Sequence, residues 1–448
     1  MSLPGYQRSR PVNASWLGEV PEHWRTVPLK FVVALRSGGT PNKDNLTYWD
    51  GDVPWASAKD LKAPYLLDTE DHIAQKAVDD GISTLVETGS VLVVVRGMIL
   101  AHTFPVSEVW RPMAINQDLK AVTARPPLRR EFLPWLLRGI SQITLAQVDE
   151  AGHGTKVIRL DRWLSTIVPV PSGEEQVAIA AFLDHETAKI DALVAEQRRL
   201  IELLKEKRQA VISHAVTKGL DRDAPMKPSG VEWLGDVPAH WRPAPIKFCL
   251  RGLVDTQHKT APFYDDGTFL VVRTTNVRGG DLVLDGAKYT DEEGYREWTR
   301  RAVPAPGDII FTREAPAGEA CLVPQDVPLC LGQRTVLMQV DSEILDSRFA
   351  LHALYSGLAK ESIETLTQGS TVAHFNMSDI GNIPLLLPTL SEQREIVCFL
   401  DSFTRQFDTL VSEAVKSIDL LLERRTALIS AAVTGQIDVR GLAPSEAA

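Results

Sequence analysis

Two stretches of the chain carry an apolar residue at nearly every seventh position, with a second series four positions behind the first. One stretch covers residues 172–217, and the other repeats it 217 residues later. A seven-residue period sustained this long predicts a long helix whose apolar stripe packs on a partner helix, as in a coiled coil. About 44 residues at 1.5 Å each would span roughly 66 Å. We expect the stripe to contain Leu183, Ile190, Val194, Ile201, Leu204, Leu400, Phe407, Val411, Ile418 and Leu421.

Start and stop signals bracket both stretches. Residues 172–175 and 389–392 have the S/T-x-x-E form, in which the hydroxyl and the glutamate satisfy backbone N–H groups at a helix start. Gly219 and Gly435 suit the position just after a helix end. The simplest arrangement is that each long helix packs on the other one, as an antiparallel pair with pseudo-twofold symmetry. The alternative is two separate helices, each docked on its own globular module.

The offset of 217 runs through most of the chain. Trp16-Leu-Gly-Glu-Val-Pro-Glu-His-Trp24 returns as Trp233-Leu-Gly-Asp-Val-Pro-Ala-His-Trp241. Between such anchors the halves diverge, so each half joins one variable block to one repeated block. The fold class expected is α+β, with two mixed α/β modules of common fold alternating with the long helices.

The variable blocks contain short apolar runs typical of strands. Ser90–Arg96 and Asp308–Arg313 each follow a glycine-containing turn, and both predict a buried strand that ends on an arginine. These arginines occupy matching places in the two halves. Each is either a structural salt bridge or a side chain that contacts guanine O6 and N7.

Composition limits the kinds of ligand. The 448 residues include 48 Lys+Arg and 58 Asp+Glu, a net charge of −10, which argues against binding nucleic acid by bulk charge alone. Four scattered cysteines suit free thiols better than a disulfide framework. The N-terminus shows no secretory leader, and no apolar run, Val91–Val95 among them, approaches the roughly 20 residues of a membrane span. A cytoplasmic protein is expected.

Polar residues able to contact bases or phosphates gather in expected loops. Asparagine and glutamine can bond bidentately to adenine, and arginine to guanine. The turn at 37–40 offers backbone N–H groups to a phosphate, although a plain turn is the simpler interpretation. Trp24 and Trp241, with Trp16 and Trp233, are shared by both halves and are expected to pack the base of each module. The DNA-binding candidates are Arg36, Gly39, Thr40, Lys43, Trp55, Arg96, Asn116, Gln117, Arg273, Thr274, Asn276, Arg313, Gln333 and Arg334.

Catalytic motifs are poorly represented. The sequence has no phosphate-binding loop, no amino-methyltransferase tetrad and no H-E-x-x-H helix, and Gly152–Gly154 lacks the third glycine of a dinucleotide fingerprint. Asp52, Asp60 and Lys62 superficially fit a metal-dependent nuclease, but the second half has no counterpart. No catalytic or metal-ligating residue is therefore expected. The alternatives are this nuclease, or a coiled-coil scaffold whose variable blocks bind peptides.

Taken together, these motifs resemble the specificity (S) subunits of type I restriction–modification systems over nearly the whole chain. The resemblance rests on the duplicated Trp-Leu-Gly-x-Val-Pro-x-His-Trp opening and on the Glu-Gln…Phe-Leu-Asp start of each long helix. It also rests on Ser37–Pro41 followed by Tyr48–Trp55, on Ile115–Asp118 and on Thr312–Pro316. The second half departs from the pattern at Leu331–Arg334, which leaves equivalent base contacts there open.

The resemblance implies two target-recognition domains, 1–170 and 222–387, separated by helical regions at 171–221 and 388–440. Each domain would read one half of a bipartite DNA sequence through the major groove. The chain itself would not be an enzyme and would bind no cofactor. Its implied partners are double-stranded DNA, two methyltransferase subunits and two restriction (motor-nuclease) subunits. Those subunits would use S-adenosylmethionine, ATP and magnesium. The two domains would meet the DNA about one helical turn apart, so that an unread spacer separates the two half-sites.

Overall fold

The computed structural model describes residues 3–232, 234–257, 259–367 and 374–442. The chain forms two compact units, Met1–Gln197 with Lys416–Ala448, and Arg198–Val415. Each unit holds one variable block and part of each long helix. Trp233 of the repeated opening lies outside the described residues.

The first unit is a mixed α/β module. Its main sheet has the strand order β4-β12-β9-β10-β6, and its second sheet has the order β7-β5-β11-β8. Three strand pairs, β1-β2, β13-β14 and β15-β3, complete it. The elements before the long helix are β1 Ser9–Pro11, β2 Glu19–Pro21, β3 Arg25–Pro28, η1 Leu29–Phe31, β4 Val33–Ser37, η2 Leu46–Tyr48, β5 Trp49–Ala56, β6 Tyr65–Leu66, β7 Asp71–Ile73, α1 Gln75–Asp79, β8 Thr84–Val86, β9 Val91–Val94, η3 Met98–Ala101, β10 Val106–Val109, β11 Met113–Ile115, β12 Leu119–Ala124, α2 Leu133–Gly139, α3 Ser141–Ala146, β13 Val148–Glu150, η4 Gly152–Gly154, β14 Lys156–Ile158, α4 Leu160–Ser165 and β15 Ile167–Val170.

The second unit repeats this plan with different residues. Its sheets have the orders β19-β27-β24-β25 and β23-β20-β26, with the pairs β16-β17, β18-β28 and β21-β22. Its elements are β16 Met226–Pro228, β17 Asp236–Pro238, β18 Arg242–Pro245, η5 Ile246–Cys249, β19 Leu250–Asp255, β20 Phe269–Val272, η6 Thr274–Asn276, β21 Val277–Arg278, β22 Asp281–Leu282, β23 Lys288–Thr290, α6 Glu292–Trp298, β24 Ile309–Thr312, β25 Ala320–Leu322, β26 Leu329–Leu331, β27 Thr335–Val340, α7 Ser347–Leu354, α8 Gly357–Thr367, α9 Met377–Gly381 and β28 Pro384–Leu387.

The two variable blocks therefore share one fold although their sequences diverge. In each unit a central strand, β12 or β27, runs antiparallel between two neighbours, β4 and β9 or β19 and β24. In each unit a parallel pair, β5 with β11 or β20 with β26, forms part of the second sheet. The predicted strands at Ser90–Arg96 and Asp308–Arg313 are confirmed as β9 and β24, and every residue of both is buried.

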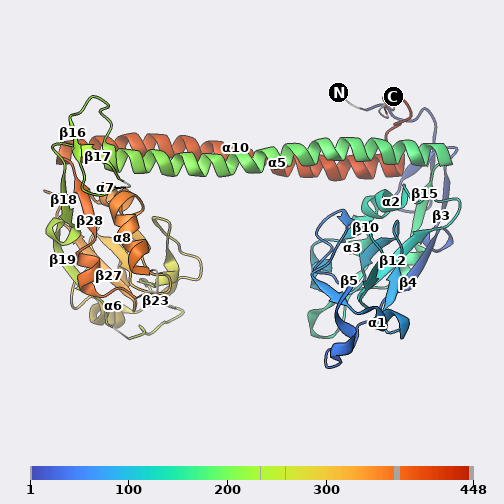
Figure 1. The fold of residues 1–448 in the computed structure, drawn as a ribbon, viewed down its shortest axis with the longest axis horizontal. Helices are drawn as coiled ribbons and strands as arrows, with labels where there is room; N and C mark the ends of the chain where they lie inside the picture. The colour runs from blue at the N-terminus through green and yellow to red at the C-terminus, as the bar shows by residue number, and fades with distance from the viewer. Residues whose placement is uncertain (1–2, 233, 258, 368–373, 443–448) are drawn as a thin grey trace. The chain divides into compact units, whose positions relative to one another are not determined.

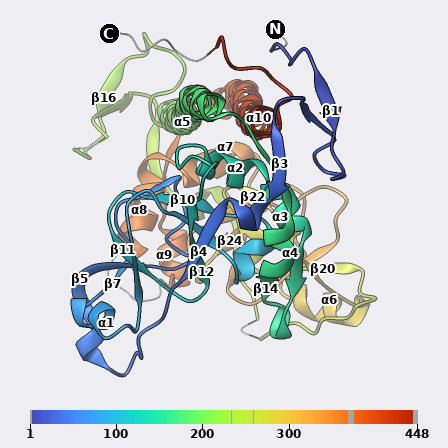
Figure 2. The same ribbon diagram turned by 90° about the vertical axis from the view of Figure 1, so that its right-hand side faces the viewer.

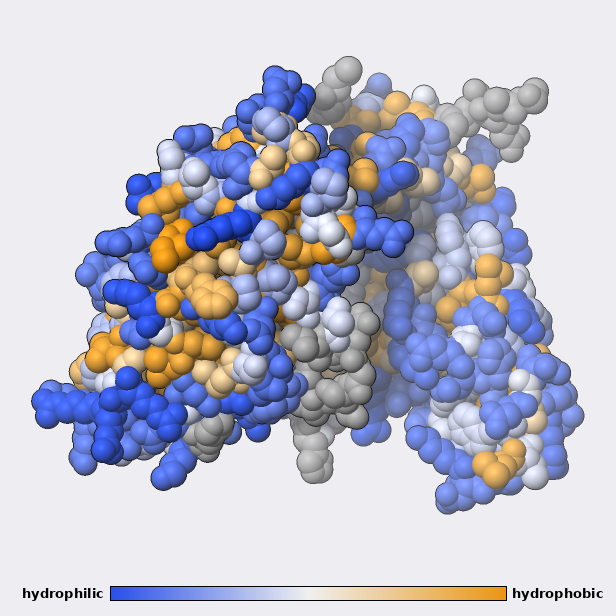
Figure 3. Space-filling view, turned by 60° about the vertical axis from the view of Figure 1, so that its left-hand side comes forward, coloured by the Kyte–Doolittle hydropathy of each residue, from blue (hydrophilic) through white to orange (hydrophobic). Residues whose placement is uncertain are grey.

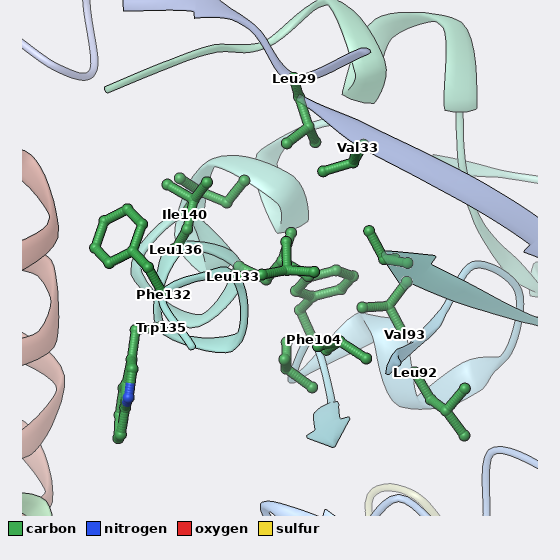
Figure 4. Close-up of a cluster of buried hydrophobic side chains, with 14 of the residues drawn as sticks. Leu29, Val33, Leu92, Val93, Phe104, Phe132, Leu133, Trp135, Leu136 and Ile140 are labelled. Carbon is green, nitrogen blue, oxygen red and sulfur yellow. The ribbon is translucent and has the colours of Figure 1, made fainter. Parts of the chain in front are cut away.

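The core of the first unit lies between the main sheet and the helices that follow it. Valine and leucine side chains of β9 are fully buried, as is Phe132 just before α2. Figure 4 shows Leu133 of α2 and Phe104 lying close to Val93. The alternating burial that a solvent-facing sheet would show is absent from β9, because both of its faces are covered.

The two apolar stretches form the long helices α5 (Gly173–Lys218) and α10 (Leu390–Thr434). Ser172 Oγ accepts from Glu175 N at 3.3 Å, and Glu175 Oε2 accepts from Ser172 N at 3.2 Å, which confirms the capping box at the start of α5. Each helix is followed at once by a glycine with a positive φ, 76° at Gly219 and 77° at Gly435. Within the described ranges no helix is both long and apolar enough to cross a membrane.

The long helices lie side by side and antiparallel (Figures 1 and 2). The beginning of α5 shares a unit with the end of α10, and the end of α5 shares a unit with the beginning of α10. An ion pair joins Asp191 to Arg425 at 2.9 Å in the first unit, and Arg208 faces Asp408 at 3.9 Å in the second. Of the ten predicted stripe residues, Leu183, Ile190, Val194, Leu400 and Phe407 are buried and the other five are half-buried. The alternative of two separately docked helices is therefore wrong.

The duplicated opening motif fastens each module to the start of a long helix. Trp24 Nε1 donates to Glu175 Oε1 at 3.1 Å, and His23 Nε2 lies 2.9 Å from the same oxygen. We call this cluster of His23, Trp24 and Glu175 the first clasp. Trp24 is 1% exposed, as expected for a packing role. Burial alone would raise the pKa of Glu175, but hydrogen bonds from His23, Trp24 and Ser172 outweigh burial and hold this pKa below its usual value.

The second clasp consists of His240, Trp241 and Glu392. Trp241 Nε1 donates to Glu392 Oε1 at 3.0 Å, and His240 Nε2 lies 2.9 Å from Glu392 Oε2. Trp241 is fully buried. The residues that identify the repeat in the sequence are therefore mostly scaffold residues.

The glutamine after each clasp glutamate ties the helix to the module's backbone. Gln176 accepts from Arg129 N at 2.7 Å and donates to the carbonyl oxygens of Pro127 and Pro171 at 3.1 and 2.9 Å. Gln393 makes the same three contacts in the second unit, with Asp346 N at 2.8 Å, Ile344 O at 3.0 Å and Pro388 O at 3.2 Å. Both glutamines are fully buried.

Candidate nucleic-acid interface

Two short loops occupy equivalent places in the two units. The first loop (116–118) joins β11 to β12, and the second loop (332–334) joins β26 to β27. Each loop follows a fully buried strand and leads into the central strand of the main sheet. Its position is therefore set by the two sheets of its unit.

Matching backbone hydrogen bonds anchor the two loops. The first residue of each donates to the neighbouring parallel strand, Asn116 N to Ala56 O at 2.9 Å and Gly332 N to Val272 O at 2.8 Å. The third residue accepts from the strand on its other side: Asp118 O from Val95 N at 2.8 Å, and Arg334 O from Arg313 N at 2.9 Å. The loops therefore share one backbone plan, although the sequence of the second departs from the family pattern.

The middle residue of each loop is a glutamine that meets a threonine hydroxyl. In the first unit Thr40 Oγ1 donates to Gln117 Oε1. In the second unit Thr260 Oγ1 donates to Gln333 Oε1 at 2.9 Å. Both threonines and Gln117 are exposed, and Gln333 is half-buried. The structure thus brings two candidates of the first half, Thr40 and Gln117, into contact.

Basic side chains flank the first loop. Arg36 on β4 and Arg96 after β9 stand near the ends of the two strands that border β12, close to where β12 leaves the loop. Arg36, Arg96 and Lys43 are exposed, and none of them forms an ion pair within the described part of the chain. Lys120 adjoins the loop and donates to Ser37 Oγ at 2.9 Å, while burial lowers its pKa.

The second loop borders a hollow of about 250 Å³. Four of the predicted residues, Arg273, Thr274, Gln333 and Arg334, line it together. Arg273 Nη2 donates to Gly286 O at 2.7 Å, whereas its buried Nε has no hydrogen-bond acceptor among the described residues. Arg334 is exposed and lies 3.5 Å from a carboxylate oxygen of Glu314. Figure 3 shows hydrophilic and hydrophobic groups interspersed on the forward face of this unit, so hydropathy alone does not mark an interface.

Several candidates of the first half serve the fold instead. Trp55 is 7% exposed, and its Nε1 donates to Gly39 O at 3.0 Å. Gly39 N donates to Ile115 O at 2.9 Å, so this N–H is not free for a phosphate, which favours the plain turn. Asn116 is buried, and its Oδ1 accepts from the N–H groups of Asp118 and Leu119 at 3.1 Å.

Two candidates of the second half are likewise structural. Asn276 is fully buried and bonds Arg273 N and Val283 O. Arg313 is 7% exposed, and its Nη1 donates to both carboxylate oxygens of Asp255 at 2.8 Å. Arg313 therefore fits the salt-bridge alternative, whereas its counterpart Arg96 is exposed.

The nuclease alternative has no geometric support. Asp60 Oδ2 accepts from Ser57 N and Oγ at 2.8 and 2.9 Å, and its Oδ1 accepts from Glu70 N at 3.0 Å. Lys62 lies 3.4 Å from Glu70. Within residues 3–442, apart from the gaps in the description, no group of three or more metal-ligating side chains occurs.

Thr260 was not predicted from the sequence. The offset of 217 aligns Thr40 with Gln257, so the repeat gives no sign that a threonine three residues later takes the same role. The contact depends on loop length in each variable block, which periodicity does not reveal.

Comparisons with known proteins agree with this architecture. A family model described as "Type I restriction modification DNA specificity domain" matches residues 21–203 and 249–417. The EcoR124I/EcoR124II type I restriction enzyme specificity subunit of Escherichia coli is 27% identical over 221 residues, which cover 49% of this chain and 48% of that subunit. The MjaIX specificity subunit of Methanocaldococcus jannaschii is 22% identical over 95% of this chain and 96% of its own length.

Solved structures show the same fold at low sequence identity. A subunit from a structure of a type I R-M system has a TM-score of 0.63 at 17% identity and covers 93% of this chain and 99% of its own. The HsdS subunit of Thermoanaerobacter tengcongensis has a TM-score of 0.51 at 17% identity, with coverage of 93% and 98%. The family model matches most of the chain, as two copies of one domain. The chain therefore belongs to the type I restriction–modification DNA specificity family and is a non-catalytic DNA-specificity subunit of such a system.

Proposed function

We propose that each unit reads one half of a bipartite DNA target, with the first and second loops in the major groove. The observation that carries this proposal is the recurrence of an exposed or half-exposed glutamine at one place in two modules of one fold. Side-chain amides at a loop tip suit base edges, because their donor and acceptor groups match those of bases in the major groove. Because different side chains surround the two loops, the two halves of the DNA target would have different sequences.

The proposed contacts divide by chemistry. Gln117, Gln333 and Arg334 are the base-reading candidates, whereas exposed Arg36, Lys43 and Arg96 suit phosphates. Arg273 and Thr274 line the hollow beside the second loop and would contact the same half-site.

The partners follow from the same proposal. Two methyltransferase subunits and two restriction subunits would assemble with the chain, in keeping with its two equivalent halves. They would supply S-adenosylmethionine, ATP and magnesium chemistry, and much of the phosphate contact that a chain of net charge −10 lacks.

Mapping of adenine methylation tests the proposal. The full chain is expressed with its methyltransferase partner, and the methylated motif is determined by genome-wide sequencing. We expect a bipartite motif that disappears without the chain, relaxes in one half in Gln117→Ala and relaxes in the other half in Gln333→Ala. Asp60→Asn should leave the motif unchanged. A motif that is continuous, or that both glutamine variants relax in the same half, would contradict the proposal.

A further inference from the structure

The threonine–glutamine contact recurs in the two units although the threonines differ in their distance from the preceding strand. Gln117 and Gln333 are equivalent through their loops, but Thr40 and Thr260 are not equivalent through the repeat. Thr40 follows β4 in the first unit, whereas Thr260 follows β19 at a different distance. Two loops of different length, each after the equivalent strand of its unit, therefore place a threonine hydroxyl on the same amide oxygen.

This contact leaves a particular part of the glutamine free. The hydroxyl donates to Oε1 in both units, and Nε2 of neither glutamine has a hydrogen-bond partner within the described ranges. The amide is held by its oxygen and presents its NH2 group. A glutamine that reads adenine uses both ends of the amide, accepting from N6 at Oε1 and donating to N7 from Nε2. Guanine instead offers two acceptors, O6 and N7, to a donor.

The neighbouring groups agree with an acceptor-rich base edge at the second loop. Arg334 is the next residue of the loop, is exposed and lies 3.5 Å from Glu314, and Arg273 is half-buried with its Nη2 donating to Gly286 O. Thr260, Gln333 and both arginines line the same hollow. Two arginine side chains thus lie beside the second glutamine.

We propose that Gln117 and Gln333 each read guanine through Nε2, and that Thr40 and Thr260 are positioning residues that hold the amide in this orientation. The inference rests on the proposed function, since it presumes that the two loops meet bases. It adds the base at one position of each half-site and a role for two threonines. Removing the threonine hydroxyl frees the glutamine amide to rotate. Its Oε1 can then accept from adenine N6 while its Nε2 donates to N7.

The test uses the full chain with its methyltransferase partner and sequencing of the methylated motif. The motif position that Gln117→Ala relaxes identifies the base that Gln117 contacts. The position that Gln333→Ala relaxes identifies the base that Gln333 contacts. We expect guanine at both positions in the unaltered protein. Thr40→Val should admit adenine at the first position only, with the preference for guanine falling roughly tenfold. Thr260→Val should do the same at the second position only.

Matched variants separate positioning from folding. Thr40→Ser and Thr260→Ser keep the hydroxyl and should keep guanine. Thr47 Oγ1 donates to Asn45 Oδ1 at 2.7 Å in the first unit, so Thr47→Val removes a similar bond away from the loop and should leave the motif intact. Misfolding lowers methylation at all sites alike, so the readout is the base composition at the position.

Three outcomes overturn the inference while leaving the proposed function standing. They are adenine at the two positions in the unaltered protein, an unchanged motif in both valine variants, and relaxation that the serine variants share. A chain that directs no bipartite methylation would instead refute the proposed function itself.

Discussion

Replacing Gln176 by alanine tests how strongly the first module depends on its long helix. The side chain is fully buried and serves three backbone groups, the N–H of Arg129 and the carbonyls of Pro127 and Pro171. Alanine has no polar atom to replace it, so one donor and two acceptors lose their partner in the interior.

The expected cost follows from these three bonds. A net intramolecular hydrogen bond contributes about 0.5–1.5 kcal/mol, and a buried group left without a partner costs about 1–3 kcal/mol. Water entering the space vacated by the side chain would recover part of this, so we expect a loss of about 3–5 kcal/mol. For a unit of roughly 200 residues, each kcal/mol lowers the Tm by about 2–4 °C, which gives a fall of about 10 °C.

Calorimetry of the full chain, with hydrogen exchange read by mass spectrometry, provides the measurement. Gln176→Ala should lower one unfolding transition and the protection of residues 127–139. Gln393→Ala should lower the transition of the second unit and the protection of residues 344–354. Gln406 is exposed on α10, so Gln406→Ala is the matched control and should change neither. The reasoning would be refuted if the Tm fell by less than about 2 °C. It would also be refuted if one variant reduced hydrogen-exchange protection equally in both units.

Two further predictions concern the first clasp and the first loop. Glu175 has a depressed pKa, so its stabilising contribution is present above its ordinary pKa of 4.5 and is lost as the pH falls through the lower folded value. The Glu175→Gln variant should therefore lose less stability than the unaltered protein as the pH falls from 5 to about 3, as measured by the Tm in thermal melts. An equal fall of Tm with pH in both proteins would contradict this. A Cβ added to Gly38 would lie 1.9 Å from Ile115 O, so Gly38→Ala should cost about 1–3 kcal/mol in denaturant unfolding and disturb reading of the first half-site. An unaltered motif at full stability would show that this turn tolerates a side chain.

The elements with strong local signals were predictable from the sequence. The seven-residue period, the capping box and the terminal glycines define α5 and α10, because each is a property of neighbouring residues. The apolar runs at β9 and β24 were equally clear. The common fold of the variable blocks could be expected from the repeat. The strand order of its two sheets could not be predicted from the sequence.

The fates of single polar residues were not predictable. Arg96 and Arg313 end equivalent strands, yet among the described residues only Arg313 meets a carboxylate, supplied by Asp255 from 58 positions away in the sequence. Asn116 and Asn276 suit base recognition by residue type, but both turn inward to satisfy backbone groups. Such choices depend on the partner that tertiary packing brings near, and one sequence does not record it.

The ion pairs between the long helices also describe how the molecule is built. Arg425 is the counterpart of Arg208, and Asp408 is the counterpart of Asp191, both at the repeat offset of 217. Both contacts therefore join the same two positions of the module, taken from opposite copies. Such a surface is self-complementary, as in an isologous interface between identical subunits. In this sense the chain resembles a homodimer whose two subunits are joined in one polypeptide. Because the two copies are covalently joined, each variable block is free to diverge from the other.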